Sequence, residues 1–407
     1  MTKYQNIYEK ILDASEVLKD IKHFTRMDHS TTFSKMTGGN IYLKLENLQK
    51  TGSFKVRGAA YAISKLTDTE KSAGVIAASA GNHAQGVAYA AQKLGIDSTI
   101  VMPIFSPVSK IQATRGYGAE VILHGSTFDD ALAYAQETAA KTGATFIHPF
   151  NDENVIAGQG TIGLEIINSL PSVEVVAVPV GGGGLVSGIA IAMKEVKPSI
   201  EIYGVEAQSA AAMKASLIAG EISELTDVDT ICDGIAVKKP GNLTFNIAKD
   251  LLDGVVTVDE FQVTRTLYYL LERSKIVVEP AGCVGLTAYL QQYINIDSKT
   301  AVAVISGGNI DMSFMSRLVE KERFRLGQSV RVRGVISDRV GSLNKVLGIV
   351  AESRINVLSV DQDRLDPDIV PNKLELELVL EVQDKNSVTK LLDKLEDIGL
   401  KFNVFED

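Results

Sequence analysis

The sequence predicts an α/β protein in which parallel strands form the main part and a ferredoxin-like βαββαβ unit follows. Short β-branched runs alternate with amphipathic helical stretches up to about residue 325, which implies parallel strands joined by crossover helices. Glycine-rich turns separate several of these strands from the helices that follow them. From residue 329 the order of elements changes to strand, helix, strand, strand, helix and strand.

The main part contains six clear strand patterns, each short and rich in β-branched residues, as expected for strands buried on both faces. Helical patterns lie between them, with apolar residues at the spacing of one helix face. The predicted strands are residues 74–79, 98–102, 120–123, 175–180, 202–206 and 301–306, and the predicted helices include residues 82–94, 109–117, 127–142 and 185–196.

The C-terminal unit is predicted to contain strands 329–336, 355–363, 373–383 and 401–404 and helices 341–353 and 386–398. Residues 373–383 alternate strongly between apolar and polar side chains, so this strand should bury one face and expose the other. We place the boundary between the main part and this unit between Glu322 and Ser329.

Length, charge and cysteine spacing favour a soluble multidomain protein and argue against a nucleic-acid-binding, zinc-binding or membrane-spanning one. A chain of 407 residues is long enough for two or three domains, and a formal net charge of −9 provides no basic surface for nucleic acid. Cys232 and Cys283 have neither CxxC nor zinc-site spacing, which favours two reduced thiols in a cytoplasmic protein. The uncharged stretch 175–193 is interrupted by Pro179 and four glycines, so we predict a strand, a turn and a helix there, and no membrane partner.

The segment TGSFKVRG, residues 51–58, places Lys55 close to a predicted helix start. We expect Ser53 to cap a helix over residues 54–66. The helix dipole and partial burial would both lower the pKa of Lys55 and free its amine to act as a nucleophile and base. By itself the segment indicates little, because most lysines near helix starts are solvated surface charges.

Four consecutive glycines follow the predicted strand 175–180 and open a helix at Leu185. Such a turn lets several backbone N–H groups converge on an anion, which suits a phosphate dianion. The pattern is neither a Walker loop nor a GxGxxG dinucleotide turn, since no Gly-Lys-Ser/Thr follows and the sixth position is Val186. The predicted phosphate-binding residues are Gly181, Gly182, Gly183, Gly184 and Leu185.

Two further turns follow predicted strands. The turn SAGNHAQG, residues 79–86, could bind a substrate carboxylate through its N–H groups, with Asn82 as a directional donor, or could simply be a capped helix start. The turn SGGN, residues 306–309, brings the neutral hydroxyl of Ser306 to the sheet edge where open α/β sheets bind ligands, or is an exit turn. Phosphate, carboxylate and an amine-reactive group together are supplied by pyridoxal phosphate and an amino acid.

In order and in detail, these motifs and the segment EPAG at residues 279–282 resemble those of fold-type II pyridoxal-phosphate enzymes, and specifically of the threonine dehydratase family. The resemblance covers about residues 5–325. The C-terminal unit resembles an ACT regulatory domain, with DRVGSL at residues 338–343 in its first turn and helix. This implies a large catalytic domain from residues 1–70 and 150–325, a small domain from residues 71–149, and an ACT-like domain at residues 329–407.

The resemblance also implies roles for individual residues. Lys55 would bond covalently to the cofactor aldehyde, Phe54 would pack on its ring, Asn82 would contact its hydroxyl, and Ser306 would face its ring nitrogen. A neutral serine at that nitrogen favours prompt loss of a β-leaving group. Lys55 and Ser79 are the predicted catalytic residues, and the predicted substrate carboxylate contacts are Ser79, Ala80, Gly81 and Asn82.

The implied reaction is β-elimination of L-threonine, and also of L-serine, to a 2-oxo acid and ammonia. Serine racemases of this fold carry a serine where this chain has Ala80, so racemisation should be minor. Glu206 and the Ala210 carbonyl match a cation site of the family, which leaves a monovalent cation open, whereas Ala212 replaces an aspartate and disfavours a divalent one. A salt bridge of Glu206 is the structural alternative.

Other interpretations remain. A serine dehydratase or a β-replacement synthase would share the fold, although synthases usually carry threonine at the position of His83. A non-catalytic amino-acid sensor is an alternative of another class. The ACT-like unit implies an amino-acid or nucleotide effector and a homodimer or homotetramer.

Overall fold

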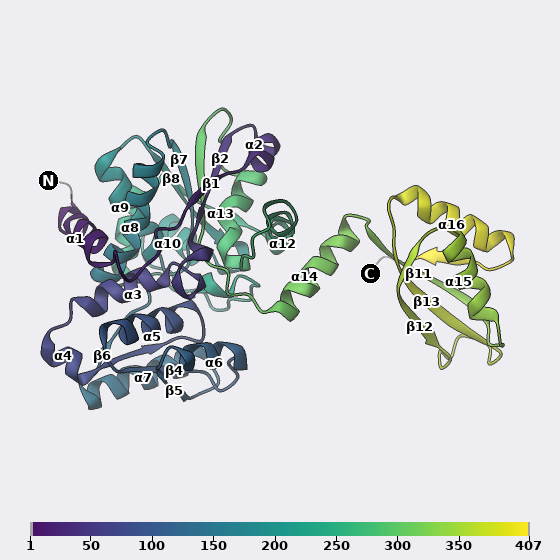
Figure 1. Ribbon diagram of the computed structural model, residues 1–407, viewed down its shortest axis with the longest axis horizontal. Helices are drawn as coiled ribbons and strands as arrows, with labels where there is room; N and C mark the ends of the chain where they lie inside the picture. Colours follow the sequence, from purple (N-terminus) through teal and green to yellow (C-terminus); the bar gives the residue numbers. More distant parts are fainter. Residues whose placement is uncertain (1–2, 406–407) are drawn as a thin grey trace. The chain divides into compact units, whose positions relative to one another are not determined.

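The computed structural model of the protein describes residues 3–405 and, for Lys385, the backbone alone. The chain divides into two compact units, Met1–Asp311 and Met312–Asp407. The first unit contains two sheets with their helices, and the second contains one sheet with its helices (Figure 1). Within the described chain no helix has both the length and the apolar character needed to cross a bilayer.

The larger sheet of the first unit has six strands in the order β1-β2-β10-β7-β8-β9. β1 pairs antiparallel with β2, and every other neighbouring pair is parallel. The predicted strands at 175–180, 202–206 and 301–306 are confirmed as central strands of this sheet, while β1, β2 and β9 were not predicted. The strands are β1 (Met27–His29), β2 (Asn40–Leu45), β7 (Val175–Pro179), β8 (Glu201–Ala207), β9 (Gly254–Val258) and β10 (Thr300–Ile305).

Helices cover both sides of the six-stranded sheet (Figure 1). α8 packs against α1, α3 and α9, and α13 packs against β7 and β10. Between α9 and the sheet lies an apolar core that includes Val176, Val178 and Ile189. These helices are α1 (Gln5–Val17), α2 (Thr31–Thr37), α3 (Lys55–Ser64), α8 (Glu153–Ser169), α9 (Gly184–Val196), α10 (Ala212–Ala219), α11 (Asn242–Leu251), α12 (Glu260–Tyr269) and α13 (Pro280–Leu290).

The smaller sheet is parallel, with strand order β5-β4-β3-β6. Its strands are confirmed where they were predicted, except for the two-residue strand β6, which was not. Helix α5 packs against both this sheet and α3, so it connects the sheet to the helix that begins at Lys55. The elements are α4 (Asp68–Ala73), β3 (Val75–Ala78), α5 (Asn82–Leu94), β4 (Ser98–Met102), α6 (Val108–Gly116), β5 (Glu120–Leu123), α7 (Phe128–Thr142) and β6 (Thr145–Phe146).

The second unit confirms the predicted βαββαβ order. Its antiparallel sheet has the strand order β12-β13-β11-β14, and the alternation predicted for residues 373–383 is seen as buried Leu374, Leu376, Leu378 and Leu380. Helix α14 groups with this unit, whereas the sequence placed residues 312–325 with the main part. The elements are α14 (Met312–Arg325), β11 (Ser329–Ser337), α15 (Ser342–Glu352), β12 (Asn356–Asp363), β13 (Lys373–Glu381), α16 (Lys385–Asp397) and β14 (Phe402–Val404).

The predicted helix cap at Ser53 is wrong. Helix α3 begins at Lys55 with Phe54 as its N-cap residue, and Ser53 is extended with a φ of −159°. A bridge pairs Ser53 with Gly307, and the Phe54 N–H donates to the Ser306 carbonyl at 3.1 Å. Because this bridge holds Ser53 in an extended conformation beside the residues that follow β10, its hydroxyl bonds no N–H of the first turn of α3. It is buried and has no hydrogen-bond partner among the described residues.

Candidate active site

Lys55 lies at the first position of α3, and its side chain is half-buried. Its Nζ donates to the Pro149 carbonyl at 3.1 Å and lies 5.3 Å from the centre of the Phe54 ring. Burial lowers the pKa of Lys55 to about 8, and the negative charge of Glu279 opposes that shift. About one-tenth of the amine is therefore unprotonated at pH 7, far more than for an ordinary lysine, and this neutral form is what a nucleophile and base requires.

The four-glycine turn lies between β7 and α9, as predicted. Gly183 has a φ of +92°, and a Cβ on Gly182 would lie 2.3 Å from the ring of Phe150, so both positions require glycine. The N–H groups of residues 181–185 donate to no protein acceptor within the described chain. Amides left without partners at the start of a buried helix fit a phosphate group.

Lys55 is connected to the glycine turn by residues 149–150. Pro149 accepts the hydrogen bond from Lys55, and the next residue, Phe150, packs directly against Gly182 and Gly184. The turn that could hold a phosphate and the amine that could bond an aldehyde thus flank the same short segment. Pyridoxal phosphate carries both groups, so the donor set fits this cofactor.

The turn after β3 ends at Gly81, which precedes the first residue of α5. Ser79 and Ala80 are half-buried, and the Ser79 hydroxyl accepts a hydrogen bond from the Gly81 N–H at 3.1 Å. The N–H groups of the first turn of α5 are the donors that a substrate carboxylate would use, as the carboxylate-binding prediction requires. His83, which follows, is buried and contacts the Ile147 carbonyl through Nε2 at 2.9 Å.

Asn82 takes part in a polar chain that the sequence did not predict. Its Nδ2 donates to Glu279 Oε1 at 2.7 Å, and its Oδ1 accepts from Asn309 Nδ2 at 2.8 Å. Asn309 Nδ2 also donates to the Thr51 carbonyl at 2.7 Å. These bonds hold Asn82, Glu279 and Asn309 together near Thr51, a few residues before the start of α3. The second N–H of Asn82 remains for the cofactor hydroxyl, which is the contact that the resemblance implies.

Glu279 is the site residue that sequence analysis left without a role. It is the N-cap residue of α13, directly before Pro280, and its carboxyl is buried. Burial and the charge of Asp233 raise the pKa of Glu279 to about 7, while the hydrogen bond from Asn82 opposes the rise. Its place in the motif EPAG was the only local signal. Its contact with Asn82 depends on the fold.

Ser306 directly follows β10 and is buried. Its carbonyl accepts from the Phe54 N–H at 3.1 Å, and its own N–H donates to the Gly282 carbonyl at 3.2 Å. Its hydroxyl makes no hydrogen bond with the rest of the described chain and remains available to a ring nitrogen. Ser306 is therefore held next to Lys55 by main-chain bonds alone.

At the predicted cation site, Glu206 is buried and receives backbone hydrogen bonds from Met213 and Lys214, both at 2.8 Å. The salt bridge considered for Glu206 is thus replaced by two backbone N–H donors of α10. Burial raises the pKa of Glu206 to about 7 against these two bonds. Ala210 lies in the short 3-10 turn Gln208–Ala210 beside it. Residues 3–405 contain no group of three or more His, Cys, Asp or Glu side chains that could hold a metal ion.

A model of the family described as "Pyridoxal-phosphate dependent enzyme" matches residues 19–307, which include every predicted cofactor contact. The chain belongs to this family. The pyridoxal-phosphate cofactor inferred from the donor set is therefore the cofactor of this family member, and the predicted fold-type II core is confirmed.

Several known members of the family are similar to this chain. An L-threonine ammonia-lyase of Thermotoga maritima is 48% identical over 383 residues, covering 94% of this chain and 95% of that protein. The structure of a processed threonine deaminase isoform 2 from Solanum lycopersicum is 38% identical with a TM-score of 0.75, covering 78% of this chain and 89% of the other. A maize serine racemase structure is 34% identical with a TM-score of 0.74, covering 79% and 98%.

Proposed function

We propose that this family member is a threonine ammonia-lyase, which converts L-threonine to 2-oxobutanoate and ammonia by β-elimination. The observation that carries the proposal is Lys55, a lysine with a lowered pKa, whose amine donates to Pro149, the residue before the Phe150 that packs on the four-glycine turn. The near full-length similarity to an L-threonine ammonia-lyase supports the choice of threonine as substrate.

The cofactor would be held by the free amides of residues 181–185, with the Phe54 ring against its face, Asn82 at its hydroxyl and Ser306 at its ring nitrogen. When bound, pyridoxal phosphate withdraws electrons from the substrate Cα and so acidifies the Cα proton. Lys55 both provides the covalent attachment and, when its amine is neutral, accepts that proton as general base. The substrate carboxylate would be held at the turn of Ser79, Ala80, Gly81 and Asn82 by the Ser79 hydroxyl and by the N–H groups of Ala80 and Asn82. The N–H groups of Ser79 and Gly81 already donate to the Val101 carbonyl and to the Ser79 hydroxyl.

Ala80 bears on the choice between elimination and racemisation. Racemisation requires a second acid–base group on the opposite face of the substrate, and a methyl group cannot transfer a proton. Loss of the β-hydroxyl is then the productive outcome, for L-serine as well as for L-threonine. A serine dehydratase and a β-replacement synthase remain the alternatives, and comparing turnover of threonine, serine and serine with sulfide separates the three.

The test of the proposed function is replacement of Lys55 by alanine. We expect Lys55→Ala to abolish 2-oxobutanoate formation from L-threonine and to remove the visible absorbance band of the bound cofactor. Lys65→Ala is the matched control, because Lys65 lies at the other end of the same helix and pairs with Asp13. Turnover that persists in Lys55→Ala would refute the proposed function. If the unsubstituted protein binds no cofactor, the sensor interpretation is favoured.

We further propose that the C-terminal unit is an ACT-type regulatory domain in a homodimer or homotetramer. Its βαββαβ order and antiparallel sheet support this assignment. An amino acid or nucleotide bound there would change turnover through different affinity for two states of the enzyme. Threonine turnover measured with and without each branched-chain amino acid and AMP tests the proposal, and an unchanged rate with all of them would contradict it.

A further inference from the structure

An ionic network lies in the core between α3, α8 and β2. Arg57 is completely buried and donates to Glu46 at 2.7 and 2.8 Å and to Glu165 at 2.7 and 2.9 Å. Lys44, also buried, donates to Glu165 and to the Thr25 carbonyl, both at 2.6 Å. Arg57 follows Lys55 by two residues in the same helix, so this network fixes the helix that carries the catalytic amine.

The network contains more positive than negative charge. Lys22 is a third cation, with its Nζ 2.6 Å from Glu165 and only 8% of its side chain exposed. Lys22, Lys44 and Arg57 thus face two carboxylates, those of Glu46 and Glu165, which leaves one positive charge in excess.

The geometry around Lys44 favours an ammonium over a neutral amine. Its Nζ has two oxygen acceptors, and the Phe24 ring lies 4.9 Å away on a third side. Burial lowers the pKa of Lys44, while the charges of Glu46 and Glu165 oppose that shift. An uncompensated buried charge is costly, so an anion that approaches the network would be stabilised.

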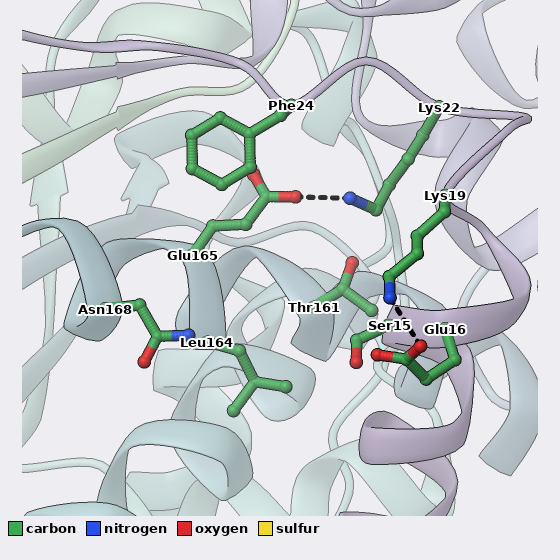
Figure 2. Close-up of a pocket in the computed structure, with 9 residues that line it drawn as sticks. All are labelled: Ser15, Glu16, Lys19, Lys22, Phe24, Thr161, Leu164, Glu165 and Asn168. Atoms are coloured by element: carbon green, nitrogen blue, oxygen red, sulfur yellow. Dashed lines mark hydrogen bonds and ion pairs between the residues drawn. The ribbon is translucent and has the colours of Figure 1, made fainter.

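A pocket opens onto this network beside Lys22 (Figure 2). Its volume is about 280 Å³, slightly below the usual range for sites that bind drug-sized ligands or cofactors. The hydroxyl hydrogens of Ser15 and Thr161 are directed to the Leu12 and Gly158 carbonyls, so neither is a free donor. A small molecule fits this pocket, whereas a nucleotide is too large.

Lys22 and Asn168 are donors of the pocket, and Lys19, which also lines it, forms an ion pair with Glu16 at 2.5 Å. The Lys22 ammonium has three N–H groups and one acceptor, Glu165, among the described residues, so two N–H groups remain. Figure 2 shows the amide nitrogen of Asn168 directed toward the middle of the pocket. Leu164 and the exposed ring of Phe24 supply apolar walls beside these donors.

We propose that this pocket binds a small carboxylate with a short aliphatic chain. The carboxylate accepts hydrogen bonds from Lys22 and Asn168 and neutralises the excess charge of the network, and the chain packs against Leu164 and Phe24. The site is separate from the proposed catalytic site at Lys55, and its existence does not depend on the reaction catalysed there.

Sodium butanoate is the probe, titrated calorimetrically into the holoenzyme at constant ionic strength set with sodium chloride. We expect saturable binding that Lys22→Met weakens at least about 10-fold, as loss of a charge-assisted hydrogen bond predicts. Butanoate bound at the turn of residues 79–82, where we place the substrate carboxylate, would form a second class of binding sites that remains in Lys22→Met. Lys10→Met is the matched control, since Lys10 also joins the N-terminal segment to α8 through an ion pair, with Glu153.

Asn168→Leu provides a second variant at an exposed position, which decides the matter if Lys22→Met does not fold. Weakened binding in Asn168→Leu with normal binding in Lys10→Met supports the site. Butanoate binding that neither pocket variant changes, or an equal loss in Lys10→Met, would overturn it. Saturable binding of inorganic phosphate in place of butanoate would overturn the assignment to carboxylates.

Discussion

Replacing Glu279 with glutamine should stabilise the protein at neutral pH. The Glu279 side chain is buried, with 5% exposure, and accepts a hydrogen bond from Asn82 at 2.7 Å. Burial, together with the charge of Asp233, raises its pKa from the usual 4.5 to about 7. A glutamine keeps one oxygen to accept from Asn82 and removes the buried negative charge, while its amide replaces one oxygen of a carboxyl that also accepts from the Asn309 N–H.

The sign and size of the effect follow from proton linkage. Below pH 4.5 Glu279 is protonated in both folded and unfolded chains and contributes no difference. Between pH 4.5 and 7 the unfolded chain loses this proton first, so stability falls as the pH rises, and above pH 7 the loss is complete. A pKa difference of this size corresponds to about 3 kcal/mol, which is the upper limit of what Glu279→Gln can recover.

The assay is urea unfolding of the apoenzyme at pH 4.5 and pH 8, which removes any contribution from cofactor binding. We expect Glu279→Gln to match the unsubstituted protein at pH 4.5 and to exceed it by up to about 3 kcal/mol at pH 8. Glu221→Gln, at an exposed position, should differ at neither pH. If Glu279→Gln is the less stable protein at pH 8, attraction to Lys55 outweighs the burial of Glu279, and the reasoning fails.

Two further predictions concern the turns. In Gly182→Ala the new Cβ would lie 2.3 Å from the Phe150 ring and displace the turn. The affinity for pyridoxal phosphate, measured by absorbance titration of the apoenzyme, should then fall at least about 10-fold. Gly348→Ala is the control, because its Cβ enters open space and the variant should bind the cofactor normally. Unchanged affinity would refute phosphate binding at this turn. Ala80→Ser adds the hydroxyl that serine racemases of this fold carry at this position and should produce D-serine from L-serine, detected by chiral chromatography. D-serine formed already by the unsubstituted protein would contradict our account.

Local sequence patterns predicted the parts of the site that are local in structure. The strand, the four glycines and the helix from residue 175 to residue 196 are neighbours in the chain, and their order alone produces a turn with free amides. The Ser53 cap was predicted with the same logic and was wrong. The competing interaction, the bridge from Ser53 to Gly307, joins positions more than 250 residues apart, and no local pattern reports it.

The polar contacts around the site were equally beyond local patterns. Asn82 and Glu279 are separated by 197 residues, and Arg57 and Glu165 by 108. A Glu before a Pro at a helix start indicates only a capped helix, and an arginine two residues after Lys55 indicates only a charge. The fold makes both residues buried partners, because α8 packs against α3 and the start of α13 brings Glu279 to Asn82 at the start of α5.

Burial lowers the pKa of Lys55 and the charge of Glu279 raises it, and these two opposed effects explain why the fold keeps the buried Glu279 carboxyl. A general base must be neutral to accept a proton and must then hold that proton until product forms. Burial alone would favour the neutral amine and weaken its hold on the proton, whereas Glu279 favours the ammonium. With the pKa of Lys55 near 8 and that of Glu279 near 7, both states of the amine are accessible at neutral pH. Burying the ionised Glu279 therefore lowers the stability of the fold, and in exchange Lys55 can both accept and release a proton near neutral pH.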